Sequence, residues 1–113
     1  MTQDEISQLG IAELHKLAAL AVHESPHISQ WDKLMLSGAI DGVFRPTLSN
    51  THALMVAAAL DMTIIFGGKV VLVSEPIGAQ SRSITYDESD ISSRMAALRR
   101  AITLLAADSA KYI

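Results

Sequence analysis

The sequence predicts one α+β domain over residues 1–113, predominantly helical, with three N-terminal helices, one β-hairpin and one C-terminal amphipathic helix. Three observations support this fold class. Apolar residues make up 50% of the chain and charged residues 19%, a composition typical of a packed domain and not of a disordered one. Four segments carry apolar residues at helical spacing, and one β-branched segment is followed by turn residues.

The first two helices are delimited by capping residues and prolines. The first begins at a capping box, Thr2–Glu5, and stops at Ser25-Pro26, because the residue before a proline avoids the α region. Gly10 weakens this helix locally and can separate off a first turn. The second helix begins at Ser29 and ends at Arg45-Pro46.

The third predicted helix is the most apolar segment. It begins near Ser49 and runs to about Phe66, and its centre, Leu54–Leu60, is apolar on every side. A helix that is apolar all round is buried all round, so we expect either the central helix of the fold or a seam between copies. Gly67-Gly68 then indicates a helix C-cap.

A hairpin and a final helix complete the chain. Lys69–Val73 and Arg82–Tyr86 are strand-like and are joined by the six-residue loop Glu75–Gln80. Asp87, Ser89 or Asp90 caps the last helix. A four-three spacing along this helix predicts one buried apolar stripe. The stripe consists of Ile91, Met95, Leu98, Ile102, Leu105, Ser109 and Tyr112.

Composition also limits the function classes. The net charge of −3 argues against general nucleic-acid binding, which needs a basic surface. The absence of cysteine excludes disulfides, thiolate zinc sites and cysteine nucleophiles, and it suits a cytoplasmic protein. We expect no signal peptide, and no membrane span either, because charge and glycines interrupt Ala53–Val73.

One motif resembles a catalytic metal site. His23-Glu24-Ser25-Pro26-His27 matches the H-E-x-x-H pattern, in which two histidines on one helical turn bind zinc and the glutamate activates water. Pro26 lies between the two histidines and interrupts the helix that this geometry requires. We therefore interpret His23 and His27 as part of a helix end, with a metal contact as the alternative, and we expect no cofactor.

Four arginines form the candidate ligand-binding set: Arg82 on the second strand, and Arg94, Arg99 and Arg100 on the last helix. Guanidinium groups suit phosphates, so these residues could hold an anionic metabolite or nucleotide. The alternative is a solvated helix face with salt bridges. Asp61 lies inside the apolar third helix and needs a partner there; we expect Lys69 or an arginine of the last helix.

The apolar surface exceeds what one small chain covers, so we expect self-association. The candidate contact residues lie on the third and last helices. They are Leu54, Leu98, Ile102, Leu105 and Tyr112.

From about Ser49 onward, the order of elements is similar to that of a known family. The matching segments are Ala57–Leu60, Gly68–Val71 and Ser83–Tyr86, followed by Ile91, Leu98 and Ile102. In this order, a helix, a hairpin and a helix, the chain resembles the gpW-like head-completion family of phage head–tail joining proteins. The first 48 residues lie outside the match, and the loop Glu75–Gln80 is longer than a tight turn. The resemblance implies a non-enzymatic virion part seated against a ring of other subunits, with no catalytic residues.

The sequence therefore favours a non-catalytic protein that acts by assembly, either with itself or within a larger complex. The alternative is a small protein that binds an anionic metabolite or nucleotide through its arginines and histidines. An enzyme is the third hypothesis, and it depends on the H-E-x-x-H match alone.

Overall fold

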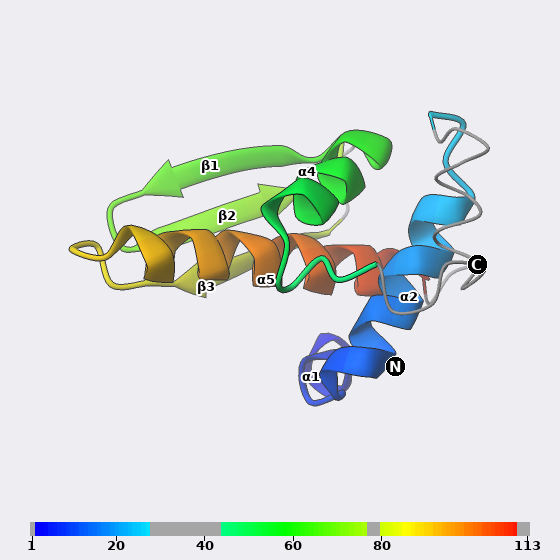
Figure 1. The fold of residues 1–113 in the computed structure, drawn as a ribbon, viewed down its shortest axis with the longest axis horizontal. Helices are drawn as coiled ribbons and strands as arrows, with labels where there is room; N and C mark the ends of the chain where they lie inside the picture. Colours follow the sequence, from blue (N-terminus) through cyan, green and yellow to red (C-terminus); the bar gives the residue numbers. More distant parts are fainter. Residues whose placement is uncertain (1, 28–43, 77–79, 111–113) are drawn as a thin grey trace.

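The computed structural model describes residues 2–27, 44–76 and 80–110 and contains helices together with a three-stranded antiparallel sheet (Figure 1). This agrees with the predicted helical α+β class. The elements are α1 (Gln3–Ser7), α2 (Ile11–His23), α4 (Asn50–Ala59), β1 (Thr63–Gly67), β2 (Val70–Ser74), β3 (Ser81–Thr85) and α5 (Ile91–Ala110). The core of the predicted second helix, residues 28–43, and Tyr112 lie outside the described residues.

The predicted first helix is two helices. The capping box is confirmed: the Thr2 hydroxyl accepts from the Glu5 backbone N–H, and the Glu5 carboxylate accepts from the Thr2 N–H at 2.9 Å. The chain breaks after α1, and Gly10 is the N-cap of α2. At the other end of α2, the buried Ser25 hydroxyl donates to the Ala59 carbonyl at 2.6 Å. This bond ties the end of α2 to the end of α4.

The third helix is shorter than predicted. Ser49 is its N-cap, as expected, but α4 ends at Ala59 and not at Phe66. Asp61 follows with a left-handed φ of 54°, which a helix interior does not allow. The β-branched run that begins at Thr63 then forms a strand, because pairing with β2 outweighs the helical pattern.

The predicted hairpin is present as β2 and β3, and β1 adds a third strand on the far side of β2. Gly67-Gly68 does not cap a helix, contrary to the prediction. Gly67 pairs with Val70, so Gly68 and Lys69 form a two-residue turn between β1 and β2. Gly68 has φ +61°, the conformation that a type II′ hairpin turn requires at its first central position.

The central helix is α5 and not α4. Every residue from Ala101 to Asp108 is buried, because α5 packs against α1, α2, α4, β2 and β3. In Figure 1, α5 lies across the near face of the sheet, and α4 and α2 pack along its other sides. Of the two alternatives predicted for this helix, the central position is wrong, since Leu54 is 50% exposed in the single chain; a seam between copies stays a prediction.

Candidate interaction surface

Arg82 belongs to a buried polar cluster and not to an open anion site. Its guanidinium binds the carboxylate of Asp108 through Nε at 2.6 Å and Nη2 at 2.8 Å. It also donates to the Ser7 hydroxyl and the Gln3 carbonyl, and the Gln3 amide donates to Asp108 at 3.0 Å. Since Arg82 is 11% exposed and Asp108 is fully buried, the cluster locks α1 onto β3 and α5.

The other three arginines point to different neighbours. Arg94 lies over the Phe66 ring, with its guanidinium carbon 4.4 Å from the ring centroid, and near Tyr86. Arg100 donates to the Ser7 carbonyl at 3.3 Å. Arg99 donates to a backbone carbonyl and a side-chain amide near the start of α4. The structure therefore does not bring the four predicted arginines into one ligand site; they hold elements of the chain together instead.

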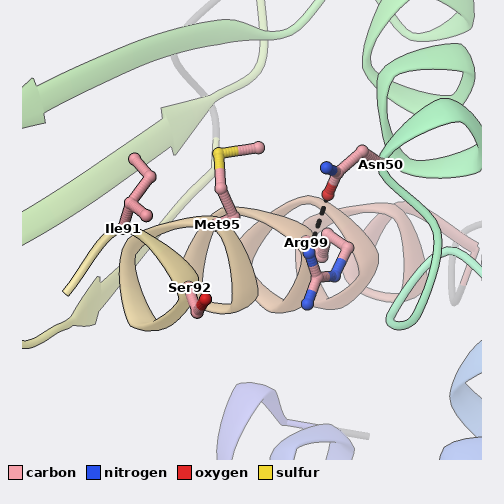
Figure 2. A pocket seen from close by; sticks show the side chains of 5 residues that line it. All are labelled: Asn50, Ile91, Ser92, Met95 and Arg99. Carbon is pink, nitrogen blue, oxygen red and sulfur yellow. Dashed lines mark hydrogen bonds between the residues drawn. The ribbon is translucent and has the colours of Figure 1, made fainter.

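Arg99 borders an open hollow of about 240 Å³ between α4 and α5 (Figure 2). Its Nη1 donates to Asn50 Oδ1 at 2.7 Å and its Nε to the Thr47 carbonyl at 3.0 Å, which fixes the guanidinium in place. Ile91 and Met95 lie along the same side of α5 in Figure 2, so the hollow combines one cation with apolar side chains. The other lining residue is Ser92.

The H-E-x-x-H residues form a helix end. α2 stops at His23 and Glu24 is its C-cap, so the two histidines do not share a helical turn. His27 instead pairs with Asp61 at 3.3 Å, both side chains being more than half exposed. The expected partners of Asp61, Lys69 or an arginine, are therefore wrong. Within residues 2–27, 44–76 and 80–110, no three His, Asp or Glu side chains lie where they could hold a metal ion together.

Two other histidines secure the segment that leads into α4. His15 Nε2 lies 2.6 Å from the Thr47 hydroxyl, and His52 Nδ1 accepts from the Arg45 backbone N–H at 2.9 Å. Partial burial lowers the pKa of both imidazoles, and the nearby positive charge of Arg45 lowers each further. These contacts favour the neutral rings, and the sequence offered no periodicity or motif from which to predict them.

The predicted contact residues fall into two groups. Leu98, Ile102 and Leu105 are buried within the chain's own core, so α5 does not offer them to a second copy. The predicted stripe is therefore buried at these three positions, but α5 is buried on every side from Ala101 to Asp108, and the first stripe residue, Ile91, is 69% exposed. Leu54 is on the surface, and Tyr112 is outside the described residues. Of the predicted contact residues that the structure describes, Leu54 alone is therefore available for association.

The sheet has one uncovered face. α5 packs on the side that carries Val71, Val73 and Ile84, whereas the opposite side is exposed or half-buried throughout. The register places Ile65 of β1 beside Leu72 of β2, and Leu72 beside Ser83 of β3, across the middle of this open face. The open face consists of Thr63, Ile65, Gly67, Val70, Leu72, Ser74, Ser81, Ser83 and Thr85, and none of these residues is charged.

Sequence reasoning missed both the open face and Asp108. The alternation of β3 was visible, but assigning Thr63–Gly67 to a helix hid the third strand and therefore the width of the face. Asp108 lies three and seven residues after Leu105 and Ala101, among buried positions of α5. An acidic residue at such a position needs a buried partner, and this signal could have paired it with Arg82.

Comparison of the chain with protein-family models, with curated proteins and with solved structures gives no match. Within the described ranges no helix is long and apolar enough to cross a membrane.

Proposed function

We propose that this protein is non-catalytic and acts through assembly with further copies of itself, with the sheet as the contact element. The observation that carries this proposal is the uncharged open face, with Ile65 and Leu72 at its centre. In an antiparallel sheet packed on one side, the other side is usually polar and solvated. On the open face of this sheet the polar residues are serines and threonines, and removing their hydroxyl groups from water costs far less free energy than removing a charged group.

The exposure of Ile65 supports the same proposal. Ile65 is 53% exposed although it lies in the middle of a strand, and Leu72, its cross-strand neighbour on the same face, is half-buried. Contiguous exposed apolar groups, unlike single scattered ones, mark sites of protein association.

The test is to place one charge on the open face and measure the molar mass in solution by light scattering. Ile65→Lys should weaken self-association at least about tenfold, because the ammonium would be desolvated at the contact. Leu20→Lys is the matched control, because Leu20 is also 53% exposed and belongs to α2, which lies away from β1 in Figure 1. Equal loss of association in both variants, or in neither, would contradict the sheet as the contact element.

The family resemblance supplies one specific setting for assembly. A gpW-like head-completion protein would seat against a ring of other subunits, and the order α4, β2, β3, α5 follows that helix–hairpin–helix pattern. The additional strand β1 departs from it. We include a virion role within the assembly proposal; binding of the purified protein to phage portal or connector rings, measured by electron microscopy, tests it.

A second candidate function is binding of a small anion in the hollow beside Arg99. The observation in its favour is a fixed guanidinium in a hollow that the apolar Ile91 and Met95 also line, which suits a carboxylate or phosphate on an apolar body (Figure 2). Thermal-shift measurements with a panel of nucleotides and carboxylates test it. Stabilisation of the wild type that Arg99→Ala removes would support the site, and no stabilisation by any compound would dismiss it.

A further inference from the structure

The outer edge of β1 carries backbone groups that have no partner among the described residues, and they lie at defined positions. Gly67 and Val70 flank a two-residue turn and therefore form a hydrogen-bonded pair, as do Ile65 and Leu72 two residues along. The N–H and C=O groups of the alternate residues, Ile64 and Phe66, point away from β2. No backbone hydrogen bond to these two residues from outside the sheet is present in the described part of the chain.

The other side of β2 supports this alternation independently. The Tyr86 N–H donates to the Lys69 carbonyl at 2.8 Å, so the odd-numbered residues of β2 bond to β3. The even-numbered residues, among them Val70 and Leu72, must then bond to β1. This leaves Ile64 and Phe66 as the outward-facing residues of β1.

The two edges of the sheet are protected to different extents. On β3 the Ser81 carbonyl accepts from the Gln3 side chain at 3.2 Å, so α1 covers part of that edge. On β1 the sequence Thr63–Gly67 contains no charge and no proline, and its pairing with β2 is continuous, without a bulge. Charged residues, prolines and bulges are the features by which natural sheets normally prevent an exposed edge from pairing with another chain. In Figure 1, β1 forms the upper border of the sheet, with no other labelled element above the arrow.

We propose that β1 of one molecule pairs antiparallel with β1 of a second copy about a two-fold axis at Ile65, which joins the two sheets into one of twice the width. This inference rests on the proposed self-association and specifies its geometry: the edges of the two sheets join, and the open faces of both copies form one wider face on the same side. The axis follows from the edge chemistry: centring on Ile65 places each Ile64 opposite Phe66 of the second copy. Both residues present their N–H and C=O outward, so each such pair exchanges two backbone hydrogen bonds.

The side chains are compatible with this symmetry. Ile65 would face Ile65 of the second copy in a non-hydrogen-bonded pair, where Cα atoms lie about 4.5 Å apart and side chains are closest. On the open face, Leu72 and Ile65 of each copy would form one apolar row across the joint. A two-fold contact needs a surface that is complementary to itself, and an uncharged strand satisfies this without opposing like charges.

Cysteine cross-linking tests the geometry, because the chain contains no cysteine and a single introduced thiol is unique. Ile65→Cys should oxidise to a covalent dimer in good yield, since the two Cα atoms would fall in the range that a disulfide bridges. Thr63→Cys is the control: two residues from the axis, its Cα atoms would lie roughly 13 Å apart. Leu72→Cys, a strand further in, should likewise remain unlinked, whereas stacking of two open faces would link it in preference to Ile65→Cys.

Amide hydrogen exchange of the wild-type protein gives a second reading that needs no substitution. The N–H groups of Ile64 and Phe66 should exchange more slowly as protein concentration rises, because they become bonded only in the pair. If the protein is dimeric by light scattering but the Ile65→Cys variant does not cross-link and these amides stay unprotected, edge pairing is wrong while self-association stands. A monomer at all concentrations would overturn both proposals.

Discussion

Replacement of Asp108 by alanine tests the internal cluster that holds α1 in place. The Asp108 carboxylate is fully buried and accepts from Arg82 at 2.6 and 2.8 Å and from Gln3 at 3.0 Å. Asp108→Ala removes all three bonds and leaves the Arg82 guanidinium, 11% exposed, without its counter-charge. The remaining acceptors, the Ser7 hydroxyl and the Gln3 carbonyl, do not neutralise it.

The expected loss is large for this chain. Removing one partner of a buried ion pair costs about 3–5 kcal/mol, against a total stability of about 5–15 kcal/mol for a domain. With a shift of roughly 4 °C for each kcal/mol at this size, the melting temperature should fall by roughly 10–20 °C. Urea denaturation followed by circular dichroism measures the free energy of unfolding directly.

Two controls distinguish an unpaired buried charge from lost packing. Replacing both partners by apolar residues, Arg82→Met with Asp108→Leu, should recover most of the stability, because no buried charge is left alone. Lys16→Ala breaks an exposed pair with Glu13 and should cost under about 1 kcal/mol. If the stability of the Asp108→Ala variant is within about 1 kcal/mol of wild type, the cluster does not hold α1 in place as a buried ion pair.

Three further predictions concern the core, the histidines and Tyr86. Leu98→Ala should cost about 2–5 kcal/mol in urea denaturation, because Leu98 is 6% exposed in the core; a smaller loss would contradict its packing. Lowering the pH through about 6.5, the ordinary histidine pKa, should lower the free energy of unfolding, because His15 and His52 have lower pKa values in the folded chain and bind protons more readily in the unfolded one. The double variant His15→Gln with His52→Gln should show a smaller pH dependence. Tyr86→Phe should leave the melting temperature unchanged or higher, since its buried hydroxyl has no partner within the described structure; a marked fall would reveal an unrecognised bond.

The sequence predicted the elements whose signals are local. The capping box at Thr2, the cap at Ser49 and the hairpin Val70–Thr85 all appear within a residue or two of their expected bounds. β1 could not be predicted in this way, because a short apolar run has no periodicity that separates helix from strand. The pairing of β1 with β2, two different segments of the chain, decides its conformation. Because Thr63–Gly67 was assigned to a helix, Gly67-Gly68 was also wrongly predicted to be a helix C-cap instead of part of a hairpin turn.

The candidate site was harder to predict for the same reason. The arginines were recognised as chemically capable groups, but their partners come from distant parts of the chain, as with Arg82 and Asp108 or Arg99 and Thr47. The stripe on α5 was right for Leu98, Ile102 and Leu105, which are buried, and wrong for Ile91, which is exposed. A stripe in a sequence indicates that residues are buried; it does not indicate which chain buries them. Only the register of three strands reveals that Ile65 and Leu72 share an open face.

Native mass spectrometry of the purified wild-type protein tests assembly through the sheet, because it reports subunit number, bound metal and bound ligand together. Assembly through the sheet predicts a dimer that carries neither metal nor small molecule, with its proportion increasing as the protein is concentrated. A monomer at every concentration, or a stoichiometric zinc ion that is lost on changing His23 or His27 to alanine, would contradict the account.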